Sequence, residues 1–435
     1  MIDSSHAYVT PQELRIGLYV DLEMGWMSHP FPKGSFKIST LRQIETLRGL
    51  GLKQVRYIPA RSDPPAPPEL TTAPDDAATG SASADGAAPV PAPMDATAVK
   101  QMQHAALIER QRATLELCDQ RFASAIRRYR QVIERMPHEP LAAAALCQQL
   151  VDAMVGDMVS QSESSIRLLS ESTGDRAWMH PVNVTVLTLL LGKALGMERD
   201  ALRELGVAAF LHDVGKTHLP DRLRIADASF SPAEYRLYQS HVAQSITIAQ
   251  QLELSAEVQR TISQHHEMMD GSGFPRQSRG PEISRSGKVL ALVNRYENMC
   301  NPARPSAAIT PHEALSMIFS QMKDKHDITV LAAFIRMMGV YPPGSVVQLA
   351  DGRHALVVSV NSARPLRPRV IVHDHAIAKE DALILDLEHA PSAGIRRSLR
   401  PDLLPRAAAD YLTPRLRICY FFEQAADPVR GEVIA

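Results

Sequence analysis

The sequence predicts a mainly α-helical protein with a small α+β module at its N-terminal end and a small β-rich appendage at its C-terminal end. Three observations support this fold class. Hydrophobic residues recur at steps of three and four between residues 98 and 135, and helix-start signals punctuate residues 179–339. Short β-like segments surround one helical pattern before residue 60, and after Tyr341 the pattern changes to strands and tight turns.

Residues 1–60 are expected to form the α+β module. The segments LYVDLEM, SFKI and QVRYI are β-like, and one helix opens at Thr40, where TLRQ fits a capping box. Residues 61–97 are rich in proline and alanine and hold almost no large hydrophobic side chain. Because burial cannot offset the entropy of ordering such a segment, we expect a disordered linker there.

Residues 98–175 are expected to form a helical hairpin, because the segment MPHEP at 136–140 separates two amphipathic patterns. Residues 341–423 are expected to be β-rich. The segments SVVQLA and RHALVVSV flank Asp351-Gly352, which is a hairpin turn signal, and RVIVHD and ALILDL suggest further strands.

Residues 176–340 are expected to form a helical domain. Strong helix starts occur at Ser231 and Thr310, because each is followed by a proline and, three positions on, by a glutamate that can close a capping box.

Composition excludes several classes of function. The chain has 435 residues, 45% of them hydrophobic, which is enough for several domains. Lys and Arg total 47 against 48 Asp and Glu, so no basic excess indicates binding to bulk nucleic acid. The four cysteines form no CxxC pair, and neither a leader sequence nor a membrane span is recognisable, so we expect a cytoplasmic protein.

Histidines gather within the helical domain. Taken singly, His180 and His241 are more simply explained as solvated helix residues. Taken together, the set suits iron, manganese or zinc bound by nitrogen and oxygen ligands, and an aspartate among histidines can bridge two cations. The side chains in question are His180, His212, Asp213, His241, His265 and His266.

A binuclear centre of this kind predicts hydrolysis of a phosphate ester, since two cations can share a hydroxide and hold both sides of a phosphodiester. Lys216 follows His212 by four residues, close enough to neutralise charge on a phosphate oxygen. The alternative for Lys216 is compensation of a helix dipole at a C-terminus.

The tracts LHDVGK and, some fifty residues later, HHEMMDGSGFP resemble those of the HD-GYP family of metal-dependent phosphodiesterases, which act on cyclic di-GMP. The resemblance covers about Met179 to Gly339 and includes the tract KVLALVNRYENMCNPARP. The first sixty residues and the YPPGS segment resemble the flanks found in one proteobacterial branch of that family.

This resemblance implies an HD-type helical bundle in which the six side chains above hold two divalent metal ions. Asp213 would bridge the ions and take part in catalysis, and Lys216 would contact the scissile phosphate. The implied reaction is hydrolysis of cyclic di-GMP to pGpG, with further cleavage to GMP as an alternative. Iron or manganese is favoured as the metal, with zinc, magnesium or nickel as alternatives.

The sequence departs from the family pattern at four positions. Asn294 stands where the family supplies a further metal-binding aspartate, and we expect it to coordinate more weakly. Phe274 replaces the tyrosine of GYP, so a hydroxyl contact with the ligand is lost. Arg304, expected to bind substrate, falls one residue late, and Arg176 replaces a glutamate that binds a third metal in some members.

The loop after His266 is expected to turn sharply through its glycines. Gly273 can let backbone amides approach a phosphate, and Asp270 is expected to support the site from outside the ligand set or to cap the turn. Glu267 is expected either to support the ligands in the same way or to lie on an exposed helix face.

Two alternatives to cyclic di-GMP hydrolysis stay open. One is a signalling module that binds cyclic di-GMP or a partner protein without turnover, which Asn294 and Phe274 favour. The other is a phosphohydrolase for a different nucleotide. Signalling proteins are expected as partners, and the amphipathic helices after residue 98 allow a homodimer, although an intramolecular core is the simpler explanation.

Overall fold

The structure is a computed structural model. It describes residues 7–22, 35–49, 52, 54–63, 96–160, 164–170, 176–227, 229–361, 364–390 and 393–424. Two compact units emerge, residues 1–109 and residues 110–435, and each is described by itself. The linker expected over residues 61–97 lies largely outside the described residues.

The first unit is built on a four-stranded antiparallel sheet in the order β1-β4-β2-β3. Its elements are β1 (Ala7–Val9), η1 (Pro11–Glu13), β2 (Tyr19–Asp21), β3 (Ser35–Lys37), α1 (Leu41–Gly49), β4 (Val55–Tyr57) and η3 (Pro59–Arg61). Thr40 Oγ1 accepts from the amide of Gln43, and Gln43 Oε1 accepts from the amide of Thr40, which is the predicted capping box. Val20, Ile38 and Leu47 form its core, which confirms the small α+β module.

Two long helices and a strand precede the helical bundle of the second unit. α2 (Ala96–Arg135) and α3 (Pro140–Val159) form the expected hairpin, but the expectation of a hairpin up to residue 175 is wrong. β5 (Ser164–Leu168) occupies that part, with Ile166 and Leu168 buried. A five-residue alternation is too short to be distinguished from a helix end by sequence, and its partner strands, β7 and β11, lie far along the chain, after residue 350.

The helical bundle follows. Its elements are α4 (Arg176–Ala194), α5 (Arg199–Leu211), η4 (Val214–His218), η5 (Asp221–Leu223), α6 (Pro232–Gln239), α7 (His241–Gln251), α8 (Ala256–Gln264), η6 (Gly280–Glu282), α9 (Arg285–Cys300), η7 (Pro305–Ala307), α10 (Pro311–Met322), η8 (Lys323–Lys325) and α11 (Ile328–Met338). Both predicted capping boxes form, at Ser231 and at Thr310. α4 is buried on all sides between Met179 and Gly192 because α3, α5, α9 and α11 surround it.

The predicted C-terminal strands form, and they build one sheet with β5 from earlier in the chain. The sheet runs β10-β6-β7-β5-β11, with β8 paired to β7 and β9 paired to β8, and β5 therefore lies inside it. Its other elements are β6 (Val346–Leu349), β7 (His354–Asn361), β8 (Arg369–Val372), η9 (Lys379–Asp381), β9 (Ile384–Asp386), β10 (Ile395–Leu399), η10 (Pro401–Leu403), α12 (Arg406–Leu412) and β11 (Tyr420–Gln424). Gly352 has a φ of +91° in the predicted β6–β7 hairpin.

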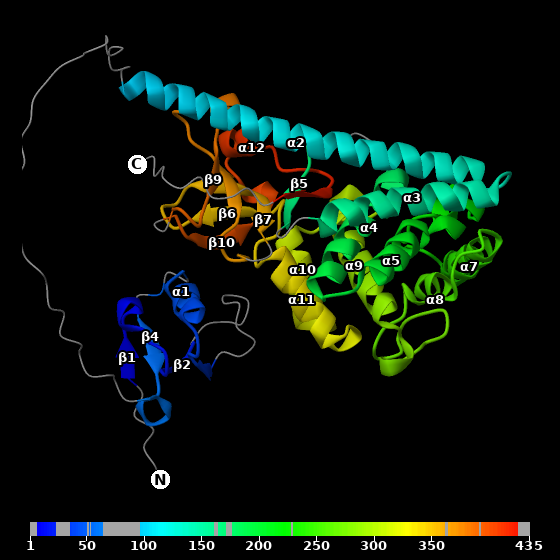
Figure 1. The fold of residues 1–435 in the computed structure, drawn as a ribbon, viewed down its shortest axis with the longest axis horizontal. Coiled ribbons are helices and arrows are strands. Elements are labelled where there is room, and N and C mark those ends of the chain that lie inside the picture. Colours follow the sequence, from blue (N-terminus) through cyan, green and yellow to red (C-terminus); the bar gives the residue numbers. More distant parts are fainter. Residues whose placement is uncertain are drawn as a thin grey trace, which may run out of the picture. The chain divides into compact units, whose positions relative to one another are not determined.

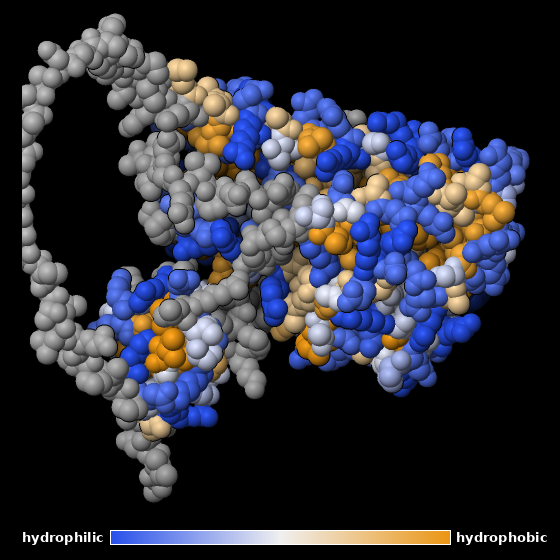
Figure 2. Space-filling view, viewed as in Figure 1, coloured by the Kyte–Doolittle hydropathy of each residue, from blue (hydrophilic) through white to orange (hydrophobic). Residues whose placement is uncertain are grey.

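α2 lies across both the sheet and the bundle (Figure 1). Gln111 exchanges hydrogen bonds with the backbone of Ile384, and Tyr129 packs edge-on against Phe210 with 4.8 Å between ring centroids. Hydrophilic and hydrophobic residues intermingle along α2 on the face shown in Figure 2. Met102 and Leu117 of this helix are exposed, but a homodimer stays a prediction.

Two further findings concern the cysteines and the hydrophobicity of the helices. All four cysteines are buried and unpaired. Among the described residues, no helix combines the length and the hydrophobicity that crossing a bilayer requires.

Because β5 ties the sheet to the bundle, an Ile166→Ala change should destabilise both together. We expect a loss of roughly 2–5 kcal/mol from the free energy of unfolding, since a buried side chain leaves a cavity. Chemical denaturation followed by far-ultraviolet circular dichroism measures it. Ile328→Ala, at a position 63% exposed, is the control and should stay within about 0.5 kcal/mol. An unchanged midpoint of the helical signal in Ile166→Ala would contradict a single cooperative unit.

Candidate metal centre

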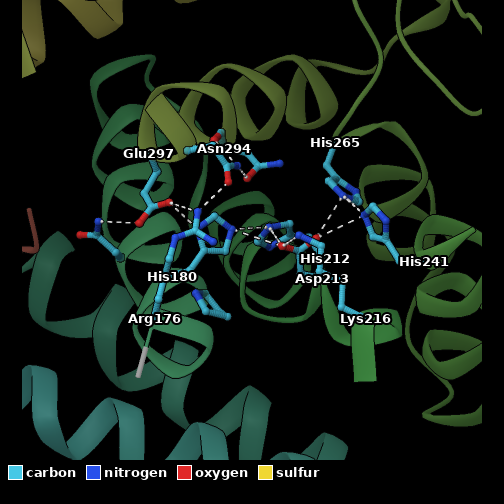
Figure 3. A network of polar contacts seen from close by, with 12 residues as sticks. Arg176, His180, His212, Asp213, Lys216, His241, His265, Asn294 and Glu297 are labelled. Carbon is cyan, nitrogen blue, oxygen red and sulfur yellow. Dashed lines mark hydrogen bonds and ion pairs between the residues drawn. The ribbon is translucent and has the colours of Figure 1, made fainter. Parts of the chain in front are cut away.

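Four parts of the bundle bring the predicted ligands to one place. His180 lies on α4, His212 and Asp213 follow α5, His241 opens α7, and His265 and His266 follow α8. Figure 3 shows His180, His212, Asp213, His241 and His265 converging from separate parts of the bundle. His180 is 4% exposed and His241 fully buried, so the alternative of solvated helix residues is wrong for both.

The carboxylate of Asp213 stands between two pairs of imidazoles. Its Oδ2 lies 3.3 Å from Nε2 of His180 and 3.3 Å from Nε2 of His212. Its Oδ1 lies 3.3 Å from Nε2 of His241 and 3.6 Å from Nε2 of His265. Each oxygen therefore faces its own pair of nitrogens, which is the arrangement of a bridging carboxylate.

The hydrogen bonds of the other ring nitrogens indicate which nitrogen is free. Nδ1 of His212, His241 and His265 points at the carbonyl oxygen three residues earlier, at 2.7, 2.5 and 2.6 Å. A carbonyl only accepts, so each Nδ1 carries the proton and each neutral ring presents a bare Nε2. Nε2 of His241 and Nε2 of His265 are 3.3 Å apart, so a cation bound here would accept both lone pairs.

Further buried atoms fit the same conclusion. Among the described residues, Nε2 of His266 and Oδ1 of Asp213 are buried without a hydrogen-bond partner. The possible ligand atoms form two groups, and within each group all atoms lie within 4.8 Å of one another. One group consists of His180, His212 and Asp213, and the other of Asp213, His241, His265 and His266. The side chains therefore fit two adjacent metal ions that share Asp213.

Burial sets the protonation of most of these rings. It lowers the pKa of His212, His265 and His266, and lowers that of His241 to about 4, so these imidazoles are neutral ligands at neutral pH. Burial would also lower the pKa of His180, but Glu297 and Asp213 outweigh it and the pKa is raised.

Lys216 lies against the bridging carboxylate. Its Nζ donates to Oδ2 of Asp213 at 2.5 Å and sits 5.2 Å from the centroid of the Tyr238 ring. Burial would raise the pKa of Asp213, but His212 and Lys216 hold it well below its usual value. The side chain of Lys216 points into the cluster, so dipole compensation at a helix end does not account for its position.

Glu297 is a member of the site that the sequence did not reveal. It is 2% exposed on α9, and one of its oxygens accepts a short hydrogen bond from Nδ1 of His180 (Figure 3). A carboxylate behind a histidine fixes the ring and its tautomer. The available signal was spacing, because Glu297 follows Asn294 by three residues and so shares its helix face.

Asn294 and Arg176 belong to one buried polar network with Glu297. Asn294 Oδ1 accepts from Nδ2 of Asn298 at 2.7 Å, and Asn298 Oδ1 accepts from Arg176 at 2.8 Å. Arg176 also lies 3.8 Å from Glu297. Position 176 is thus occupied by a guanidinium, which stays positively charged and cannot serve as a metal ligand.

Two acidic side chains in the loop after His266 stabilise it by accepting hydrogen bonds from other residues of the loop. Glu267 is buried, and its two oxygens accept from the amides of Arg276 at 2.7 Å and Ser278 at 2.9 Å, so the exposed-face alternative is wrong. Asp270 Oδ1 accepts from the amide and the hydroxyl of Ser272, which confirms its turn-capping role.

Gly273 is required by packing. A Cβ there would stand 2.5 Å from the carbonyl oxygen of His266 and 2.5 Å from the amide of Met268. The loop thus folds back against the backbone that carries His266. Contact of Gly273 with a phosphate stays a prediction.

Phe274 and Arg304 differ in their relation to the cluster. The ring of Phe274 stacks on that of His266 at 4.4 Å between centroids. Arg304 is exposed and holds Asp227 through two contacts of 3.0 Å. Its predicted contact with substrate would require this ion pair to open.

A mainly α bundle that buries a two-sided cluster of histidines around one carboxylate defines a helical domain with a candidate metal centre. The family model of the HD domain matches residues 150–330, and that of a domain of unknown function, DUF3391, matches residues 8–147. Residues 150–330 are thus similar to the HD domain, and the LHDVGK and HHEMMDGSGFP tracts, which resemble those of the HD-GYP branch, lie within this match. The second match extends well beyond the module expected over residues 1–60.

Several known proteins are similar to this chain. A cyclic di-GMP phosphodiesterase of Pseudomonas aeruginosa is 27% identical over 84% of this chain and 85% of its own length. A cyclic di-GMP phosphodiesterase of Thermotoga maritima is 30% identical over 40% of this chain and 47% of its own. Among solved structures, Bd1817, an HDG"Y"P protein from Bdellovibrio bacteriovorus, aligns over 76% of this chain and 98% of its own, with 14% identity and a TM-score of 0.42.

The packing of Gly273 predicts that Gly273→Ala will displace the backbone behind His266. We expect a loss of about 1–3 kcal/mol from overpacking, together with a smaller rise in Tm on adding Mn²⁺. Gly394→Ala is the matched control, because a Cβ there meets nothing within 4 Å. Thermal unfolding with and without metal measures both effects. Equal behaviour of the two variants would refute the packing role.

Proposed function

We propose that this chain is a phosphodiesterase that hydrolyses cyclic di-GMP with two divalent metal ions. The observation that carries the proposal is the placement of Asp213 between the His180–His212 pair and the His241–His265 pair, each within 3.3–3.6 Å of one carboxylate oxygen. The Pseudomonas aeruginosa relative, which is named a cyclic di-GMP phosphodiesterase, supports the choice of substrate.

Each residue of the site has its own role in the proposed reaction. His180 and His212 would hold one cation, His241, His265 and His266 the other, and Asp213 both. When bound, such a pair of ions supplies a hydroxide at neutral pH and withdraws charge from the phosphate. Lys216, held beside Asp213, is placed to neutralise a phosphate oxygen as charge develops on it.

The product and the metals extend this proposal. Attack on one phosphodiester bond of cyclic di-GMP opens the ring and gives pGpG, and attack on the second gives GMP. A ligand set of imidazole and carboxylate favours iron or manganese, with zinc, magnesium or nickel as alternatives.

A second candidate function has support from specific residues. Asn294 offers no charge to the metal, and Phe274 offers no hydroxyl to a ligand, so a module that binds cyclic di-GMP without turnover is the main alternative. A different cyclic dinucleotide is a further one, since a Vibrio cholerae relative, 26% identical over 38% of this chain and 35% of its own, is named a 3'3'-cGAMP-specific phosphodiesterase.

The test is a turnover assay on protein purified under low oxygen. Metal per chain is measured first, and cyclic di-GMP and 3'3'-cGAMP are then followed by chromatography with Mn²⁺ or Fe²⁺ added. Formation of pGpG or GMP supports the proposal. Stoichiometric binding of cyclic di-GMP without product in every metal supports the binding module instead.

Because both metal positions share one carboxylate, Asp213→Asn should lose both ions rather than one. We expect metal per chain to fall from about two to below one and turnover to fall by at least about 100-fold. Asp410→Asn is the control, at a side chain that is 76% exposed. Retention of one tightly bound ion in Asp213→Asn would show that the carboxylate is not shared.

Restoring a charge at position 294 should strengthen the His180 side of the centre. We expect Asn294→Asp to tighten binding of one metal by about tenfold, or about 1.4 kcal/mol, and to raise turnover. Gln251→Glu adds the same charge at an exposed position at the end of α7 and is the control. An equal gain in both variants would indicate a general charge effect, and no gain in Asn294→Asp would refute the weakened-ligand account.

A further inference from the structure

The chain that leads into β11 is held by two buried asparagines of the bundle. Asn301, which follows α9, accepts from the amide of Ile418 at 2.8 Å and donates to its carbonyl at 2.8 Å. Asn183 on α4 accepts from the amide of Tyr420 at 2.9 Å and donates to the carbonyl of Ile418 at 3.1 Å. These amides satisfy the strand's backbone as a neighbouring strand would.

The same two amides contact the carboxylate behind His180. Nδ2 of Asn301 donates to Oε1 of Glu297 at 2.9 Å, and Nδ2 of Asn183 lies 3.4 Å from that oxygen. Oε2 of Glu297 accepts from Nδ1 of His180. One oxygen of Glu297 therefore faces the metal cluster, and the other faces the strand.

We propose that Asn183 and Asn301 are positioning residues which make the C-terminal strand β11 part of the metal centre, by fixing Glu297 against His180. The effect is confined to the metal position formed by His180, His212 and Asp213. Metal binding at that position and attachment of β11 to the bundle then strengthen each other, because a coupling between two sites is reciprocal.

Because these hydrogen bonds are buried, the loss of any one of them is costly. Asn183 is fully buried, Glu297 is 2% exposed and Asn301 is 5% exposed, so these groups lie away from bulk water. An amide removed from this network leaves a buried carboxylate oxygen and backbone groups of Ile418 unpaired, which costs far more than an exposed contact would. Glu297 would then shift, and His180 with it.

The other metal position does not depend on the strand. His241 and His265 are oriented by the carbonyl oxygens of Tyr238 and Ile262, three residues before each of them. Those contacts are set locally by the helix ends. This position therefore serves as an internal reference in the same molecule.

The first experiment is Asn301→Leu in the full chain, with metal per chain measured after dialysis against a weak chelator. We expect one Mn²⁺ to bind as in the wild type and the other to bind about 10–100-fold more weakly, the range found for residues that support metal ligands. Tyr420→Phe is the matched control. It removes the hydrogen bond that the Tyr420 hydroxyl donates to the carbonyl of Pro343 and the one that it shares with the Tyr296 hydroxyl. It spares the asparagine contacts and should keep both ions.

The second experiment needs no substitution and decides the matter if Asn301→Leu fails to fold. Hydrogen exchange of the wild-type chain is compared with and without Mn²⁺. We expect the amides of Ile418 and Tyr420 to exchange about tenfold or more slowly with metal bound. Protection confined to the loop after His266, with no change at Ile418 and Tyr420, would overturn the proposal.

The inference requires that the cluster binds metal, as proposed above, but it does not require a particular substrate. A wild-type chain that binds no metal would refute the proposed function. A wild-type chain that binds two ions, together with a folded Asn301→Leu variant that binds both equally well, would refute the role of β11 alone.

Discussion

The buried carboxylate of Asp213 is the constraint around which the bundle is arranged. An ionised carboxylate inside a protein is costly unless opposite charge and hydrogen-bond donors surround it. α4, α5, α7 and α8 each bring an imidazole within 3.6 Å of it, and Lys216 adds a full positive charge. The packing of these four helices therefore also determines how the four imidazole rings are placed around the two carboxylate oxygens of Asp213.

The histidines are oriented by two different devices. Three of them, His212, His241 and His265, use a backbone carbonyl three residues earlier, so a helix end with its unsatisfied carbonyls is enough to set the ring. His180 lies within α4, where the carbonyls are already engaged by the helix. It relies instead on Glu297, which is 117 residues away in the sequence.

This difference explains which parts of the site the sequence could predict. The ligands lie in short tracts with fixed local spacing, and the helix starts at Ser231 and Thr310 are local as well. The partnership of Glu297 with His180 and the place of β5 in the sheet depend on distant contacts, and periodicity carries no information about them. The sequence left the role of Glu267 open, because the residues next to it do not reveal that its side chain accepts hydrogen bonds from the amides of Arg276 and Ser278.

The C-terminal sheet also depends on contacts between residues that are distant in the sequence. A small sheet on a helical domain could be dispensable if only hydrophobic contacts joined the two, since such contacts tolerate repacking. Here a polar chain joins them, in which each buried donor and acceptor has a specific partner from Ile418 through Asn301 and Glu297 to His180. Buried polar networks are either satisfied or destabilising, so sheet and metal cluster constrain each other's geometry. Strand β5, placed between β7 and β11, extends that constraint to the chain immediately before the bundle.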